Sequence, residues 1–120
     1  MSSTDPVVIL SYARTPMGAM QGALSDVSAT ELGATAVKGA VERAGIDGGD
    51  VDRIYMGCVL PAGLGQAPAR QAGFKAGLGE EVPATTLNKM CGSGMKAAMN
   101  FGYSDDEFTT SMASRTSTAS

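Results

Sequence analysis

Histidine is absent from this chain of 120 residues, and cysteine occurs only twice, as Cys58 and Cys91. Without histidine and without a CxxC pair, the sequence lacks the residue clusters that usually bind metal ions. The two cysteines lie 33 residues apart (91 − 58) and are too few for a disulfide framework. The sequence therefore predicts no metal site and a reducing compartment.

Long apolar runs and long runs of one charge are also missing. No apolar stretch approaches the roughly 20 residues that span a bilayer, and residues 1–6 lack the basic and apolar regions of a secretory signal. The net charge is −3, so the sequence provides no basic surface for nucleic acid. We expect a soluble, intracellular protein without nucleic-acid or membrane partners. Its expected location is cytoplasmic, or mitochondrial or peroxisomal in a eukaryote.

What is present favours an α/β layer structure. The chain is 43% hydrophobic, with sixteen glycines and few aromatic residues, which suits one close-packed domain. Three apolar segments predict strands, the first of them buried on both faces: Val7–Leu10, Val51–Met56 and Ala84–Leu87. Helical patterns follow each of them, over residues 28–45 with a capping box at Ser28 and a stop at Gly45, over Gln66–Ala76, and after Cys91. This alternation predicts a parallel sheet with right-handed crossovers.

The composition changes near residue 100. Nine of the twenty residues from Phe101 to Ser120 are Ser or Thr, and Asp105–Glu107 adds an acidic cluster that we expect to be solvated. No periodic apolar pattern continues there. We therefore predict a folded part over residues 1–100 and a tail without regular structure over residues 101–120.

The segment Asn88-Lys-Met-Cys-Gly-Ser-Gly94 places Cys91 between an extended run and the start of a helix. Unpaired backbone N–H groups and the helix dipole favour a thiolate at such a position, and the thiolate is the nucleophilic form. Gly92 and Gly94 leave room for a substrate carbonyl. The sequence therefore predicts that Cys91 is a covalent nucleophile; the alternative is a small buried apolar residue, the role that we expect for Cys58.

The Cys91 segment closely resembles the nucleophile signature of the thiolases, which form or cleave a carbon–carbon bond next to a coenzyme A thioester. Val8–Gly18 resembles the opening strand and turn of that family, and Gly57–Gln71 resembles a segment that the family uses for its fold and subunit contact. The resemblance covers about residues 7–99 and is greatest to the biosynthetic acetyl-CoA acetyltransferases. It implies the N-terminal part of a thiolase N-domain, a partial βαβαβα layer with parallel strands and an incomplete sheet.

The resemblance also implies a mechanism. Cys91 would take the acyl group of an acyl-CoA as an acyl-thioester intermediate and pass it to a second acetyl-CoA, giving acetoacetyl-CoA, or would act in the reverse thiolysis. Coenzyme A thioesters would be the substrates, with no permanently bound cofactor. The family forms homodimers or homotetramers.

Three catalytic segments of the family do not occur in this sequence: an Asn-Glu-Ala type, a Gly-His-Pro and a Cys-x-Gly segment. We therefore expect a truncated chain that is inactive by itself as an acyltransferase. Two alternatives stay open. The chain could be a non-catalytic fragment that associates with an intact thiolase through residues 57–71, or it could belong to a related condensing or lipid-transfer branch.

Overall fold

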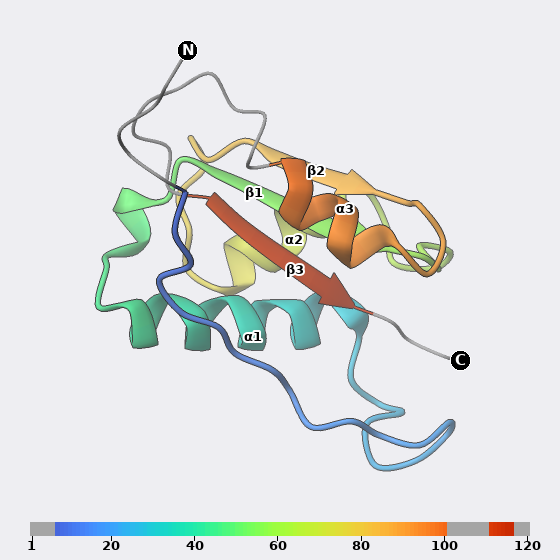
Figure 1. Cartoon of the computed structure of the whole chain (residues 1–120). Coiled ribbons are helices and arrows are strands. Elements are labelled where there is room, and N and C mark those ends of the chain that lie inside the picture. Colours follow the sequence, from blue (N-terminus) through green and yellow to red (C-terminus); the bar gives the residue numbers. More distant parts are fainter. Residues whose placement is uncertain (1–6, 101–110, 117–120) are drawn as a thin grey trace.

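A computed structural model describes residues 7–100 and 111–116, and it has the predicted α/β architecture with parallel strands (Figure 1). Within these residues the strands form one sheet in the order β2-β1-β3, and both pairings are parallel. The elements follow in the order α1 (Ala29–Ala44), η1 (Gly48–Asp50), β1 (Arg53–Cys58), α2 (Pro68–Lys75), β2 (Ala84–Leu87), α3 (Ser93–Met99) and β3 (Ser111–Thr116).

Helix α1 begins and ends where the local sequence signals predicted. The Ser28 hydroxyl accepts a hydrogen bond from the Glu31 N–H at 3.2 Å, and the Glu31 carboxylate accepts one from the Ser28 N–H at 3.1 Å. Together they form a capping box, which satisfies amides that lack partners within the helix. Gly45 ends the helix with a φ of 70°, in the left-handed region that glycine adopts without a steric cost.

Replacing Ser28 with alanine is expected to lower the free energy of unfolding by about 1 kcal/mol, because the Glu31 amide loses its acceptor. The shift of the urea midpoint measures this cost. Ser28→Thr keeps a capping hydroxyl and should unfold close to the wild type. Equal midpoints for the Ala and Thr variants would contradict the role of the cap.

Helix α2 connects the two parallel strands β1 and β2. Pro68 occupies its first turn, where a missing N–H costs nothing, and the Ala69 N–H donates to the Thr86 hydroxyl of β2 at 2.9 Å. Near the C-terminal end of the crossover, the Arg70 guanidinium donates to the carbonyls of Glu80 and Val82 at 2.8 and 3.3 Å. The first bond attaches the start of α2 to β2, and the Arg70 bonds attach α2 to the segment that leads into β2.

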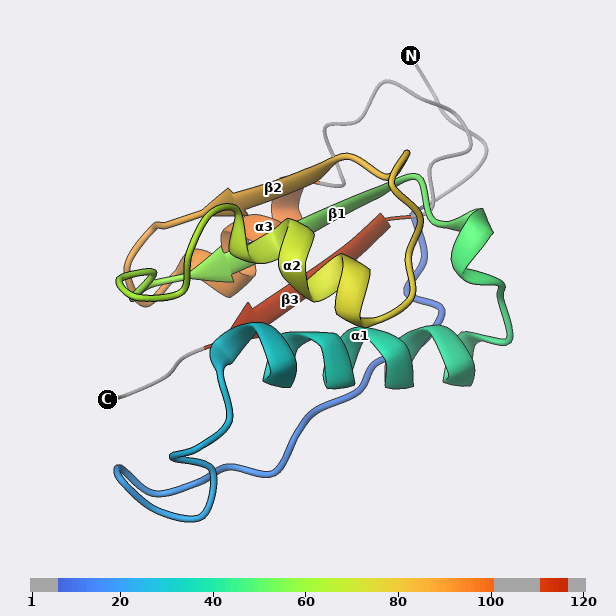
Figure 2. The same ribbon diagram turned by 180° about the vertical axis from the view of Figure 1, so that it is seen from behind.

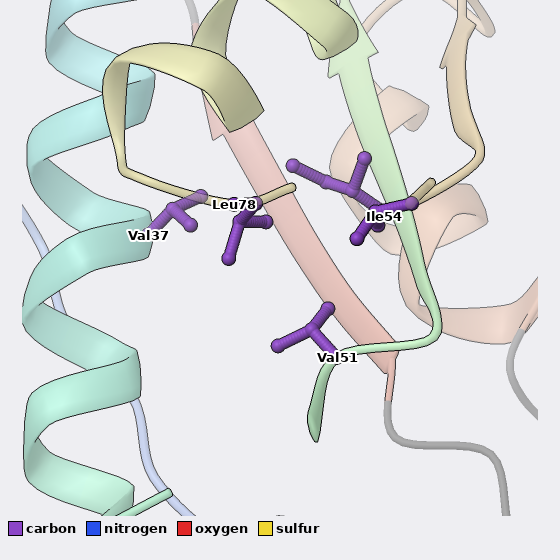
Figure 3. Packing of buried hydrophobic residues seen from close by; sticks show 5 residues of the cluster. Val37, Val51, Ile54 and Leu78 are labelled. Carbon is purple, nitrogen blue, oxygen red and sulfur yellow. The ribbon is translucent and has the colours of Figure 1, made fainter. Parts of the chain in front are cut away.

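The helices cover the sheet from both sides. In Figure 1, α3 lies in front of β1, whereas α2 lies in front of the sheet in Figure 2, which shows the molecule from behind. Alternate residues of a strand face opposite sides, so Ile54 and Met56 share one face, and both are almost fully buried. Ile54 packs with Val37 of α1 and with Val51, Leu78 and Val82 (Figure 3). Met56 packs with Ala69 and Ala72 of α2.

The predicted buried strand at Val7–Leu10 is wrong. Residues 7–10 have no regular secondary structure, and their side chains are between 59% and 87% exposed. The physical reason is that β1 has two edges, which β2 and β3 occupy. The chain instead follows α1, where the Ser11 hydroxyl donates to the Ala40 carbonyl and Arg43 donates to the Tyr12 carbonyl at 3.0 Å.

The prediction of a tail without regular structure is wrong for residues 111–116, which form β3. This strand pairs in register with the whole of β1, from Arg53 opposite Ser111 to Cys58 opposite Thr116. The backbone makes these hydrogen bonds, so a segment without an apolar pattern can still form a strand. Residues 101–110 and 117–120, with the acidic cluster Asp105–Glu107, lie outside the described residues. The division of the chain at residue 100 stays a prediction.

Within the described parts of the chain, none of the helices is both long enough and apolar enough to cross a lipid bilayer.

Candidate active site

Cys91 lies in the turn that joins β2 to α3, at the edge of the sheet where β1 and β2 end. Ligands of open parallel sheets bind outside this carboxyl edge. Helix α3 begins at Ser93 with Gly92 as its N-cap, so Cys91 directly precedes the cap. The thiol of Cys91 is exposed, whereas Cys58 on β1 is 2% exposed, and neither forms a disulfide. The predicted burial of Cys58 is confirmed, and Cys91 is not the small buried residue of the alternative interpretation.

Two side chains fix the backbone of this turn on the N-terminal side of Cys91. The Asn88 Oδ1 atom accepts a hydrogen bond from the Met90 N–H at 2.9 Å. The Ser93 hydroxyl accepts one from the Lys89 N–H at 2.8 Å and donates one to the Met90 carbonyl at 2.6 Å. Three backbone groups of Lys89 and Met90 are therefore held by side chains.

Met90 has a φ of 48°, in the left-handed region that residues with a Cβ atom rarely adopt. Such a conformation costs about 1 kcal/mol or more and persists only where the surroundings enforce it. The bonds from Asn88 and Ser93 supply that enforcement. The residue before the candidate nucleophile is thus strained and held, as is common at functional sites.

Gly57 of β1 lets the beginning of α3 lie directly on the sheet. A Cβ atom at this position would lie 2.5 Å from the Ser93 carbonyl carbon and 2.7 Å from the Gly94 nitrogen. Only glycine permits backbones to approach this closely. Ser93, which is 2% exposed, is enclosed by this contact.

The loop that follows β1 adjoins the Cys91 turn. The Asn88 Nδ2 atom donates to the Val59 carbonyl at 3.2 Å, which connects the ends of β2 and β1. The Gln71 side chain of α2 donates to the carbonyls of Leu64 and Gln66, each at 2.7 Å, and so holds the far side of that loop. Two neighbouring loops at the carboxyl edge are therefore both fixed by amide side chains.

Other features of the described residues do not contribute to this site. Residues 7–100 and 111–116 contain no group of three or more His, Cys, Asp or Glu side chains that could hold a metal ion. A shallow hollow elsewhere on the surface is lined by residues from α2, β1 and the segment before β2, and Cys91 is not among them.

Sequence reasoning located Cys91 and its turn but missed the residues that hold the turn. Asn side chains in turns commonly accept a hydrogen bond from the backbone N–H two residues later, which is an Asx turn. Asn88, in the turn after a predicted strand, could therefore have been identified from the sequence. The contact between Gly57 and Ser93 joins positions 36 residues apart (93 − 57), and no local signal predicts it.

Comparison with known proteins shows which family has a similar sequence and fold. The family model described as the thiolase N-terminal domain matches residues 7–103. The mitochondrial acetyl-CoA acetyltransferase of Xenopus tropicalis is 60% identical over 95 residues, which are 79% of this chain and 23% of that protein. A cytosolic acetyl-CoA acetyltransferase of Gibberella zeae is 55% identical over 97 residues, 81% of this chain and 24% of that protein.

The solved structures that resemble this chain come from the same family as these relatives. A thiolase of Ascaris suum in complex with coenzyme A aligns with a TM-score of 0.76 and 35% identity, over 78% of this chain and 24% of that one. An acetyl-CoA acetyltransferase of Syntrophomonas wolfei aligns with a TM-score of 0.75 and 38% identity over the same shares. The chain spans about a quarter of the length of the curated relatives that it matches.

Proposed function

Because this chain belongs to the thiolase family, through the N-terminal domain that residues 7–103 match, we propose that Cys91 accepts an acyl group from a coenzyme A thioester. The observation that carries the proposal is the exposed thiol in a fixed turn at the carboxyl edge of the sheet. The names of the relatives support acetyl-CoA as the donor, and the coenzyme A bound to the Ascaris suum thiolase supports this class of ligand.

The proposed step exchanges one thioester for another. The Cys91 thiolate attacks the thioester carbonyl carbon, the bond from that carbon to the coenzyme A sulfur breaks, and coenzyme A leaves as a thiolate. The acyl group stays on the Cys91 sulfur. Since one thioester replaces another, the step needs no external source of energy.

We propose that the 120-residue chain performs this step slowly and does not complete an acetyltransferase cycle. Transfer of the acyl group to a second acetyl-CoA requires removal of a proton from its α-carbon, and a positioned base typically contributes about 10²–10⁴-fold to such a step. Histidine, the commonest general base, does not occur in the sequence.

The oligomeric state expected from the family is likewise a proposal for this chain. Exposed apolar side chains support self-association, notably Val8 and Ile9 in the segment before α1 and Leu60 in the loop next to the Cys91 turn. Sedimentation or size-exclusion measurements over a range of concentrations would test it, and a monomer throughout would contradict it.

Incubation with acetyl-CoA is expected to place one acetyl group on Cys91, because this is the exposed thiol of the two. Peptide mapping by mass spectrometry locates the label, and hydroxylamine should remove it, as it removes thioesters. Cys58→Ala should still be labelled, and Cys91→Ala should not. Labelling of lysines alone, or equal labelling of the two cysteines, would refute the proposal.

A further inference from the structure

We infer that Ser93 is a positioning residue for the acyl-transfer step, since its buried hydroxyl sets the backbone conformation from which Cys91 attacks. The inference rests on the proposed function, in which Cys91 is the nucleophile. Ser93 itself does not touch the reacting atoms. It acts through Lys89 and Met90, the two residues before Cys91.

A hydroxyl is suited to this task because it donates and accepts at once. The Ser93 Oγ atom accepts from the Lys89 N–H at 2.8 Å and donates to the Met90 carbonyl at 2.6 Å, so it bridges two successive residues of the turn. The side chain is only 2% exposed, and water competes poorly for these bonds. Alanine at position 93 would remove the acceptor of the Lys89 N–H, whereas the Met90 carbonyl would keep the bond from the backbone N–H of residue 93 at 3.1 Å.

The strain at Met90 connects this bridge to the thiol. Met90 is held at a φ of 48°, and Cys91 is the next residue, so relaxation of Met90 would rotate the peptide plane that carries Cys91. Attack on a thioester carbonyl depends on such placement, because a displacement of about 1 Å can reduce a reaction rate by about 10²-fold. Simple alkylation of an exposed thiol has no comparable geometric requirement.

The two hydrogen bonds of the Ser93 hydroxyl are distinct from the contact that holds helix α3 on the sheet. Helix α3 is seated on β1 through the close contact between Gly57 and the Ser93–Gly94 backbone, and that contact does not involve the Ser93 hydroxyl. Ser93→Ala should therefore leave α3 in place and loosen only the turn over residues 89–91, which keeps the bond from the Met90 N–H to Asn88. This separation gives the positioning role a distinct experimental signature.

The test compares two reactions of Cys91 in the 120-residue chain and its Ser93→Ala variant. Acetylation by acetyl-CoA should fall by about tenfold or more, because it depends on the placed thiol. Alkylation of Cys91 by iodoacetamide should change much less. Alkylation of buried Cys58 should stay slow in both proteins, since it reports general unfolding.

Val37→Ala is the matched control, because Val37 lies on α1 in the core next to Ile54 and Leu78, away from the turn. It should destabilise the chain and leave the ratio of Cys91 acetylation to alkylation unchanged. The inference fails if Ser93→Ala acetylates at the wild-type rate, or if its two reactions change in parallel with faster labelling of Cys58. If the wild type is not acetylated on Cys91, the proposed function fails and the inference fails with it.

Discussion

Gly57→Ala is expected to destabilise the chain by about 1–3 kcal/mol and to slow acetylation of Cys91 by about 10²-fold. The added Cβ atom would lie 2.5 Å from the Ser93 carbonyl carbon and 2.7 Å from both the Ser93 oxygen and the Gly94 nitrogen. All three atoms belong to the backbone, so no flexible side chain can yield. Helix α3 must therefore move away from β1, and the Cys91 turn moves with it.

Urea unfolding and the rate of acetylation by acetyl-CoA measure the two effects. Gly73→Ala is the matched control, since Gly73 is also buried but a Cβ atom there meets only the ends of Leu78 and Ile54 at 3.8 and 3.9 Å. Gly73 lies inside α2, where alanine stabilises a helix by about 0.5–1 kcal/mol relative to glycine. Unchanged stability and acetylation in Gly57→Ala would show that α3 is not seated on Gly57.

Local sequence patterns, each contained in one segment of the chain, were sufficient to predict the positions of most helices and strands. The capping box at Ser28 and the stop at Gly45 located α1 to the residue, and the extended run before Asn88 located β2. The position of Cys91 just before a helix was also predictable, because its flanking glycines and the preceding strand are local features. The catalytic role of Cys91 stays a prediction.

Strand pairing could not be predicted in the same way. The run Val7–Leu10 has the pattern of a buried strand, yet the sheet holds the Ser- and Thr-rich segment Ser111–Thr116 at the edge of β1. A side-chain pattern describes how well a segment suits burial and says nothing about which distant edge is free. The contact of α3 with Gly57 also joins segments far apart in the sequence, so no local pattern predicts it.

Ile54→Ala is expected to lower the free energy of unfolding by about 2–5 kcal/mol, a large part of the total stability of a small domain. Ile54 is 1% exposed and contacts residues from α1 and from the segments before β1 and β2. Truncation removes apolar contacts and leaves a cavity where these elements meet. Urea unfolding provides the measurement, and Ile54→Val should cost only about 0.5–1.5 kcal/mol.

Ile9→Ala is the informative partner of that experiment, because the same substitution falls on a side chain that is 87% exposed. A change at such a surface position should stay within about 0.5 kcal/mol of the wild type. If Ile9→Ala instead cost as much as Ile54→Ala, Val7–Leu10 would have to be buried in solution. Either insertion at the edge of β1 that β3 occupies here or the self-association proposed above would bury this segment, and a dependence of the unfolding midpoint on protein concentration separates the two. The difference between the two isoleucines therefore measures how far Val7–Leu10 is buried in solution.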